Sequence, residues 1–134
     1  MTFADDISVN LRESAHGDLV VMEWDHPLDS VVRQYFLFDE MAGATHGSHA
    51  LKECNQVIVC LRGRAEVRIS TGRQESSTEL GVERRTVEVP CGTWRVIRTL
   101  EDDTALLVIC DKHYAEDDYI HDFAAFLAWS TERS

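Results

Sequence analysis

The residues with the clearest chemical potential lie between Gly43 and Gly63. This segment carries His49, and its spacing is that of a metal-binding motif in which two histidines and a glutamate stand between two glycines. Leu51 occupies the place of the second histidine, and Gln56 occupies the place of the glutamate. A first-row transition metal needs three or four N, O or S donors that converge on one point. The segment therefore predicts no metal, and it leaves His49 as a group suited to proton transfer near neutral pH.

The turn that begins at Pro90 also lacks a metal-binding histidine. The metal motif described above is that of the cupin β-barrels, in which a later Pro-x-Gly turn is followed three residues on by a further histidine. The chain reads Pro90-Cys-Gly-Thr-Trp-Arg at this turn, so that Trp94 and Arg95 stand where an imidazole is expected. The two segments together resemble a cupin that has lost its metal and kept a pocket.

Polar residues elsewhere could line that pocket. In a strand over residues 31–38, Arg33 and Tyr35 would share one face because alternate side chains point the same way. A buried guanidinium needs a partner, whereas a buried tyrosine is as often part of the core. Trp94 is open to two interpretations, contact with a nucleotide base or barrel core. Gln56 is expected to face inward and to hydrogen-bond a ligand or a neighbouring side chain.

Short β-strands must position these residues. Alternating or continuous apolar runs bounded by glycine, proline and acidic turns predict strands over 7–11, 19–24, 31–38, 56–61, 65–69, 86–89, 94–99 and 104–110. Residues 70–85 are polar and aperiodic and are expected to form a mobile hairpin loop. From Asp117 onward, apolar residues recur at helical spacing and predict an amphipathic helix. This pattern is typical of an all-β jelly roll with one C-terminal helix.

Composition excludes several classes of protein. A chain of 134 residues that is 44% hydrophobic supports one domain, here residues 1–134. Its formal net charge of −11, with only 13 Lys and Arg, argues against a nucleic-acid surface. No apolar run reaches the roughly 18–20 residues of a membrane span. The N-terminus lacks a targeting pattern, and four cysteines without metal spacing suggest free thiols, so a cytoplasmic location is expected.

An ordered set of short segments carries a resemblance to a known family. The segments span almost the whole chain: Gly17-Asp-Leu19, Arg33-Gln-Tyr-Phe-Leu-Phe-Asp39, Gly47-Ser-His-Ala50 with Lys52 and Gln56, Val59-Cys-Leu-Arg-Gly63, Leu106-Leu-Val108, and Tyr114 to Ile120 with Asp122, Phe123 and Phe126. In this set the chain resembles the WxcM-like sugar-nucleotide 3,4-ketoisomerases, metal-free cupins that act on dTDP-4-keto-6-deoxyhexoses.

The resemblance implies a function. It implies an isomerase that moves a keto group between C4 and C3 of a dTDP-linked 4-keto-6-deoxyhexose, without a cofactor, as a homodimer with exchanged N-terminal strands. His49 and Tyr35 are the expected catalytic residues. The expected substrate-binding residues are Arg33, His46, Ser48, Lys52, Gln56, Trp94 and Arg95, with a diphosphate as the partner of Arg33.

Departures from the family pattern leave alternatives open. Leu51 replaces the second histidine of the motif, which makes a shuttle between those two imidazoles impossible. His46, His16 and His121 stand where the family carries arginine. His46 could compensate as a catalyst, or it could be an anion contact or a turn residue, and His121 is expected at the surface. A related keto-sugar epimerase and a non-catalytic nucleotide-sugar binding module therefore stay in view.

Overall fold

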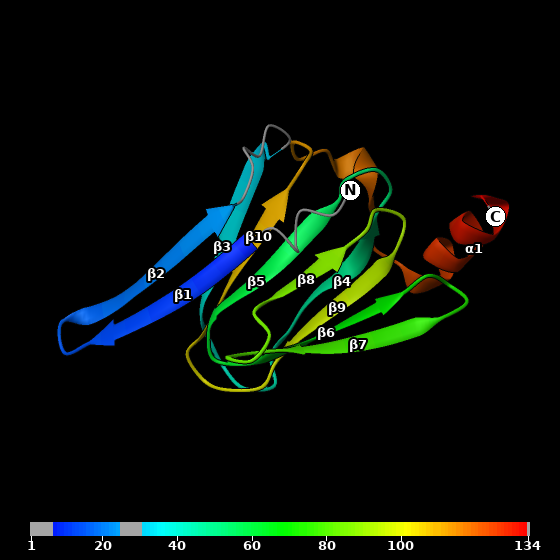
Figure 1. Ribbon diagram of the computed structural model, residues 1–134. Helices are drawn as coiled ribbons and strands as arrows, with labels where there is room; N and C mark the ends of the chain where they lie inside the picture. The colour runs from blue at the N-terminus through cyan, green and yellow to red at the C-terminus, as the bar shows by residue number, and fades with distance from the viewer. Residues whose placement is uncertain (1–6, 25–30, 134) are drawn as a thin grey trace.

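The computed structural model describes residues 7–24 and 31–133, and within them are eleven strands and one α-helix (Figure 1). Nine of these strands form two packed sheets, and the other two, β1 and β2, form a separate hairpin. One sheet has the order β3-β10-β5-β8 and the other the order β11-β4-β9-β6-β7, with all pairs antiparallel. The strands of the first sheet are β3 (Arg33–Glu40), β10 (Thr104–Cys110), β5 (Gln56–Arg62) and β8 (Thr86–Val89). Those of the second are β11 (Tyr119–Ile120), β4 (Thr45–Leu51), β9 (Trp94–Thr99), β6 (Ala65–Ser70) and β7 (Glu75–Leu80). This is the predicted cupin-type jelly roll.

The main core fills the space between the two sheets. Ile58, Leu106 and Val108 from the first sheet meet Val67 and Ile97 from the second, and all five are at most 1% exposed. Because strand side chains alternate between faces, the same strands also carry an outward apolar set that needs its own cover. The inward set fixes which residues of each strand can contribute to a site inside the barrel.

Two peripheral elements cover the outward sets. A hairpin of β1 (Ile7–Ser14) and β2 (Gly17–Trp24) lies against the outer face of β5 and β10, where Val57 and Ile109 are buried. Helix α1 (Phe123–Arg133) packs its buried Phe126 against Ala50 on the outer face of β4. In Figure 1 the hairpin and α1 lie on opposite sides of the barrel.

The structure corrects three local predictions. Residues 75–80, expected in a loop, form β7, which pairs with β6 at an end of the sheet; its solvent-facing residues are polar, so it lacks an apolar period. The C-terminal helix begins at Phe123, not near Asp117, because Tyr119 and Ile120 pair with β4 as a strand. His46, expected in a turn, lies within β4.

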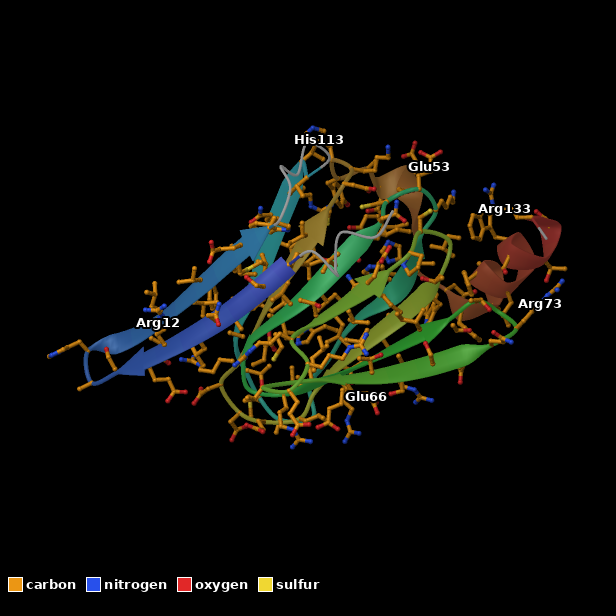
Figure 2. All side chains as sticks on the ribbon, viewed as in Figure 1. Arg12, Glu53, Glu66, Arg73, His113 and Arg133 are labelled. Carbon is orange, nitrogen blue, oxygen red and sulfur yellow. The ribbon has the colours of Figure 1, made fainter. Side chains whose placement is uncertain are left out.

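Charged side chains are dispersed over the outside. Arg12, Glu53, Glu66 and Arg73 project from four separate places on the chain (Figure 2). In the ranges that the structure describes, no helix has the length and apolar character needed to cross a bilayer.

Candidate active site

A β-bulge decides which side chains of β4 face the interior. His46 opposes Ile97 and His49 opposes Arg95, so β4 carries one residue more than β9 between the two pairs. In a regular strand, residues three apart lie on opposite faces. The extra residue in the bulge instead turns both imidazoles inward, with Gly47 at φ +63 as its left-handed residue.

Gly47 also makes room for Arg95. A Cβ at Gly47 would overlap Nη1 of Arg95, since it would lie closer than non-bonded atoms can approach. Arg95 is 2% exposed, so its guanidinium is fixed beneath the bulge. Glycine is therefore required at position 47 for two reasons: its positive φ and the space that the Arg95 guanidinium occupies.

Arg95 is the centre of a buried hydrogen-bond network. Its Nη2 donates to the Tyr35 hydroxyl at 2.9 Å, and its Nε donates to Oε1 of Gln56 at 2.9 Å. Gln56 Nε2 in turn lies 3.4 Å from the Tyr35 hydroxyl and 3.3 Å from Sγ of Cys110. The Tyr35 oxygen thus accepts hydrogen bonds from two residues, which leaves its own O–H free to donate to a ligand.

The ionisation of Tyr35 follows from its burial. Burial raises the pKa of Tyr35 more than the nearby Arg95 cation lowers it, so the phenol keeps its proton at neutral pH. Tyr35 is therefore a proton donor in this environment.

His49 has the properties of a base. Its Nε2 is buried and has no hydrogen-bond partner within the described ranges. Burial, and after it the neighbouring Arg95, His121 and Arg33, together lower the pKa of His49 to about 4. The imidazole is therefore neutral at pH 7, with an unengaged nitrogen that can take up a proton.

A group of aromatic rings extends the site toward solvent. The Tyr119 ring lies 4.9 Å from that of His49 and 5.4 Å from that of His121, measured between ring centroids. Arg33 Nη2 donates to the Tyr119 hydroxyl at 3.3 Å, and its guanidinium lies 5.0 Å from the Tyr35 ring centroid. Exposure increases from buried Arg95 through half-buried His49 to exposed His121. The cluster is therefore open at one end.

The site is locally basic in an acidic protein. Neither Arg33 nor Arg95 has a carboxylate partner among the ion pairs of the described residues. Nη1 of Arg95 is buried and lacks any hydrogen-bond partner in the same part of the chain. Two guanidinium groups without counter-ions favour an anionic ligand.

His46 faces the interior but lies apart from this cluster. Its Nε2 is 2.7 Å from Oε2 of Glu40. Glu40 reaches it through a second bulge, since β3 carries one residue more than β10 between the pairs Leu37–Leu106 and Glu40–Thr104. The structure thus binds His46 to a carboxylate, and this pairing occupies one of its two nitrogens.

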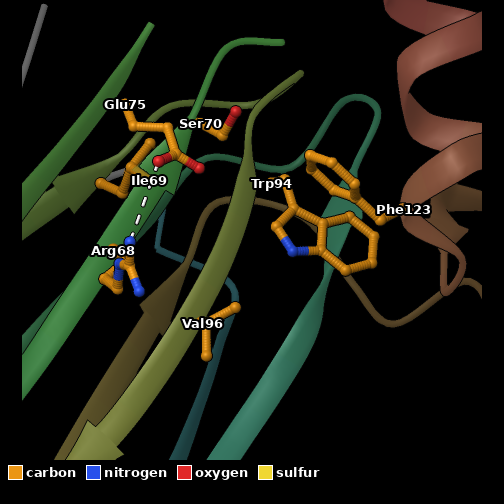
Figure 3. A pocket seen from close by; sticks show the side chains of 7 residues that line it. All are labelled: Arg68, Ile69, Ser70, Glu75, Trp94, Val96 and Phe123. Carbon is orange, nitrogen blue, oxygen red and sulfur yellow. Dashed lines mark ion pairs between the residues drawn. The ribbon is translucent and has the colours of Figure 1, made fainter.

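Besides His46, three predicted substrate-binding residues are not brought together with His49. Trp94 lies on the outer face of β9, where its ring is 5.3 Å from that of Phe123 beside a cavity of about 270 Å³ (Figure 3). Ser48 is exposed in the bulge, and Lys52 lines a separate cavity of about 310 Å³ beside α1. The inner cluster therefore holds Arg33, Tyr35, His49, Gln56 and Arg95 of the predicted set.

The positions of the lost metal ligands have other uses. Leu51 is 5% exposed and belongs to the core, and Gln56 is bound to Arg95. Within residues 7–24 and 31–133, no group of three His, Cys, Asp or Glu side chains lies close enough to hold a metal ion. The donor set found at this end of the barrel does not fit a metal.

Sequence reasoning missed Tyr119 and His121. His121 is exposed as expected, but its ring lies 6.2 Å from that of His49. Tyr119 and His121 do alternate about an apolar Ile120, but three residues are too few to establish a strand, and the helical spacing of later residues masked the pattern.

Two antiparallel sheets that enclose a polar cluster at one end define a cupin-type β-barrel protein. Residues 5–131 match the family model FdtA, described as WxcM-like, C-terminal. The chain belongs to this family, as the sequence motifs predicted.

Relatives with assigned names support the match. The chain is 28% identical over 113 residues to a TDP-4-oxo-6-deoxy-alpha-D-glucose-3,4-oxoisomerase of Aneurinibacillus thermoaerophilus, covering 84% of this chain and 81% of the relative. A crystal structure of a 3,4-ketoisomerase from Helicobacter canadensis has a TM-score of 0.75 at 26% identity, covering 94% of this chain and 98% of the other. QdtA, a sugar 3,4-ketoisomerase from Thermoanaerobacterium thermosaccharolyticum in complex with TDP, shares the fold with a TM-score of 0.75 at 24% identity, covering 96% of each chain.

Proposed function

We propose that the protein is an isomerase that moves the keto group between C4 and C3 of a dTDP-linked 4-keto-6-deoxyhexose, in the formation of an unusual deoxysugar. The observation that carries the proposal is the unpartnered, neutral imidazole of His49 beside the Arg95–Tyr35 pair. The family and the named 3,4-ketoisomerase relatives support this class of reaction.

The side chains suit the separate steps of such a reaction. A ketone at C4 makes the C3 hydrogen acidic, and His49 is the base that removes it. The Tyr35 O–H donates to the carbonyl oxygen as negative charge develops there, and Arg95 holds the phenol in place through its 2.9 Å hydrogen bond. Arg33, nearer to solvent, binds the diphosphate.

The second half of the reaction needs another proton donor. The enediol formed after loss of the C3 hydrogen must be protonated at C4. In the family pattern a second histidine would adjoin His49 on the same strand face, but Leu51 is a core residue in this chain. The proton added at C4 therefore comes from a residue other than those at positions 49 and 51.

The test is NMR of the protein with dTDP-4-keto-6-deoxyglucose in deuterated water. The proposal expects a 3-keto product with deuterium at the protonated carbon. Deuterium at C3 or a neighbouring carbon with inverted configuration and no keto migration would assign a related epimerase instead. An unchanged sugar that perturbs protein signals would assign a non-catalytic nucleotide-sugar binding module.

The same proposal includes a homodimer with exchanged N-terminal strands. Phe36 and Phe38 on the outer face of β3 are 48% and 60% exposed, and their rings stack at 5.5 Å. β3 is also an end strand of its sheet as the structure describes it. An unpaired edge with exposed aromatic residues favours a second copy of the chain. Light scattering on full-length protein and on a variant without β1 tests this, and a full-length monomer at micromolar concentration would contradict it.

We place this activity in the cytoplasm and assign it to one cupin domain over residues 1–134. Four free cysteines, at positions 54, 60, 91 and 110, suit a reducing compartment.

A further inference from the structure

A second imidazole lies beside His49 although the sequence motif has lost one. Strand β11 pairs Tyr119 with Leu51 and Ile120 with Ala50, and His121 follows immediately. Antiparallel partners share a face, so continuing this register sets His121 opposite His49 on the inner side. Their ring centroids are 6.2 Å apart with the planes at 73°. The site thus contains two imidazoles, one within β4 and one directly after β11.

Packing holds the His121 ring in this position. It stacks on Tyr119 with an interplanar angle of 12° and centroids 5.4 Å apart. Tyr119 is itself fixed by Arg33 at its hydroxyl and by His49 at its ring. An exposed side chain without such contacts would sample several rotamers, whereas stacking limits the ring to one orientation.

A carboxylate sets the protonation pattern of His121. Its Nε2 lies 3.0 Å from Oε1 of Glu116, whose other oxygen accepts a hydrogen bond from Tyr114. Because a carboxylate only accepts, Nε2 must carry the hydrogen. Proton exchange at His121 then occurs at Nδ1, the nitrogen that does not face Glu116.

The two imidazoles differ in their access to water. His49 Nε2 is buried, whereas the His121 side chain is 60% exposed. Moving a keto group from C4 to C3 requires a proton acceptor for C3 and a proton donor for C4. A neutral buried imidazole suits the first task, and an exposed imidazole paired with a carboxylate suits the second, because solvent can restore its proton.

We propose that His121 is the second proton-transfer residue of this site and supplies the proton at C4 after His49 has removed the proton from C3. This inference rests on the proposed ketoisomerase function. It assigns to β11 the task that a histidine at position 51 would otherwise perform.

The proton balance closes without an added reactant. The C3–H bond breaks, its proton goes to His49, and its electron pair forms the C3=C4 bond of an enediolate whose O4 is protonated from the hydroxyl of Tyr35. In the second half, O3–H loses its proton to the Tyr35 oxygen, the C3=O bond forms, and C4 takes the proton of His121. His49 then releases its proton to water, and His121 takes one from water.

The test separates two measurements on the same 4-keto sugar in deuterated water: exchange of the C3 hydrogen and formation of the 3-keto product. His121→Gln keeps an amide donor for Glu116 but carries no transferable proton. We expect this variant to retain C3 exchange within about 3-fold of wild type and to form product about 10²–10⁴-fold more slowly. His49→Ala should lose both. His113→Gln is the matched control, because His113 is exposed and points away from the barrel, and it should leave both rates unchanged (Figure 2).

A second variant separates loss of proton transfer by His121 from a general loss of structure at the site. Glu116→Gln removes the carboxylate that orients His121, and it should slow product formation about 3–30-fold while C3 exchange persists. The inference is overturned if wild-type protein turns over and His121→Gln forms product at the same rate. It is also overturned if product formation and C3 exchange fall together, since that pattern indicates lost positioning. Wild-type protein with neither exchange nor product would instead refute the proposed function itself, and this inference with it.

Discussion

His46 and His49 both lie on the inner side of β4, three residues apart, but their hydrogen-bond partners differ. His46 is 2.7 Å from the carboxylate of Glu40, which gives it a charged partner. His49 has a buried Nε2 with no partner in the described part of the chain, and Arg95 lies beside it. The comparison teaches that strand and residue type bring a histidine to the interior, whereas its partner determines what the histidine can do there. The paired imidazole is engaged by a carboxylate, and the unpaired one is available for chemistry.

The largest expected effect is that of His49→Ala. Removal of the base should lower turnover of the 4-keto sugar by at least about 10³-fold, within the range typical for loss of a positioned acid–base group. The fold should persist, because the variant removes an unsatisfied polar atom. Turnover and thermal melting together measure this, and wild-type turnover in the variant would refute the assignment.

A methyl group added at Gly47 should lower both stability and turnover, because it displaces the Arg95 side chain beside His49. Gly47→Ala introduces a Cβ that meets Nη1 of Arg95, and it also strains a backbone at φ +63. We expect a loss of about 2–4 kcal/mol in unfolding free energy and of about 10–100-fold in turnover.

Gly43→Ala is its matched control. Gly43 also has a positive φ, of +84, but no atom lies within 4 Å of the added Cβ. This variant should show only the backbone cost of about 1–2 kcal/mol and keep its turnover. Equal losses of turnover in the two alanine variants would mean that Arg95 is not the cause. Urea denaturation and steady-state assays provide both measurements.

The lowered pKa of His49 should make the stability of the protein depend on pH. The folded pKa of His49 is about 4, below the ordinary value of 6.5, because burial disfavours the cation. The unfolded chain therefore binds more protons between pH 6.5 and 4, so this residue's contribution to stability is present above pH 6.5 and is lost as pH falls toward 4. In urea titrations, His49→Ala should show a shallower loss over this window than wild type. An identical slope would contradict the lowered pKa.

The smallest effect is expected at the paired imidazole. His46→Gln retains a donor for Glu40, so turnover should stay within about 3-fold of wild type and stability within about 1 kcal/mol. A 100-fold loss of turnover would show that His46 takes part in chemistry and that the two imidazoles do not have separate roles.

Sequence reasoning captured the features that depend on residue type and regular alternation. The jelly roll, most strand positions and the shared face of Arg33 and Tyr35 follow from periodicity, the inward direction of Gln56 follows from motif spacing, and the structure bears them out. The family follows from the resemblance of its ordered segments, and the match to the family model confirms it. Trp94 was open to two interpretations, and the structure places it against α1, outside the barrel. Alternation alone does not reveal which face of β9 is inward.

The remaining features depend on backbone irregularities and on contacts distant in sequence. The bulges in β3 and β4 shift the alternation by one residue, so the pairing of Glu40 with His46 could not be read from spacing. Likewise, His121 reaches His49 only because a two-residue strand pairs with β4, and so short a strand has too few residues to show a period.

The bulge at Gly47 and Ser48 also determines how this protein tolerates insertions and deletions. Removing one residue between His46 and His49 would leave the two imidazoles two residues apart, and regular alternation places such residues on one face, so both would still point inward opposite Ile97 and Arg95. If β4 instead became regular with all its residues kept, one of the two imidazoles would leave the barrel interior although every functional side chain is still encoded. In comparisons across the family, a segment that is one residue shorter can therefore present the same side chains to the interior.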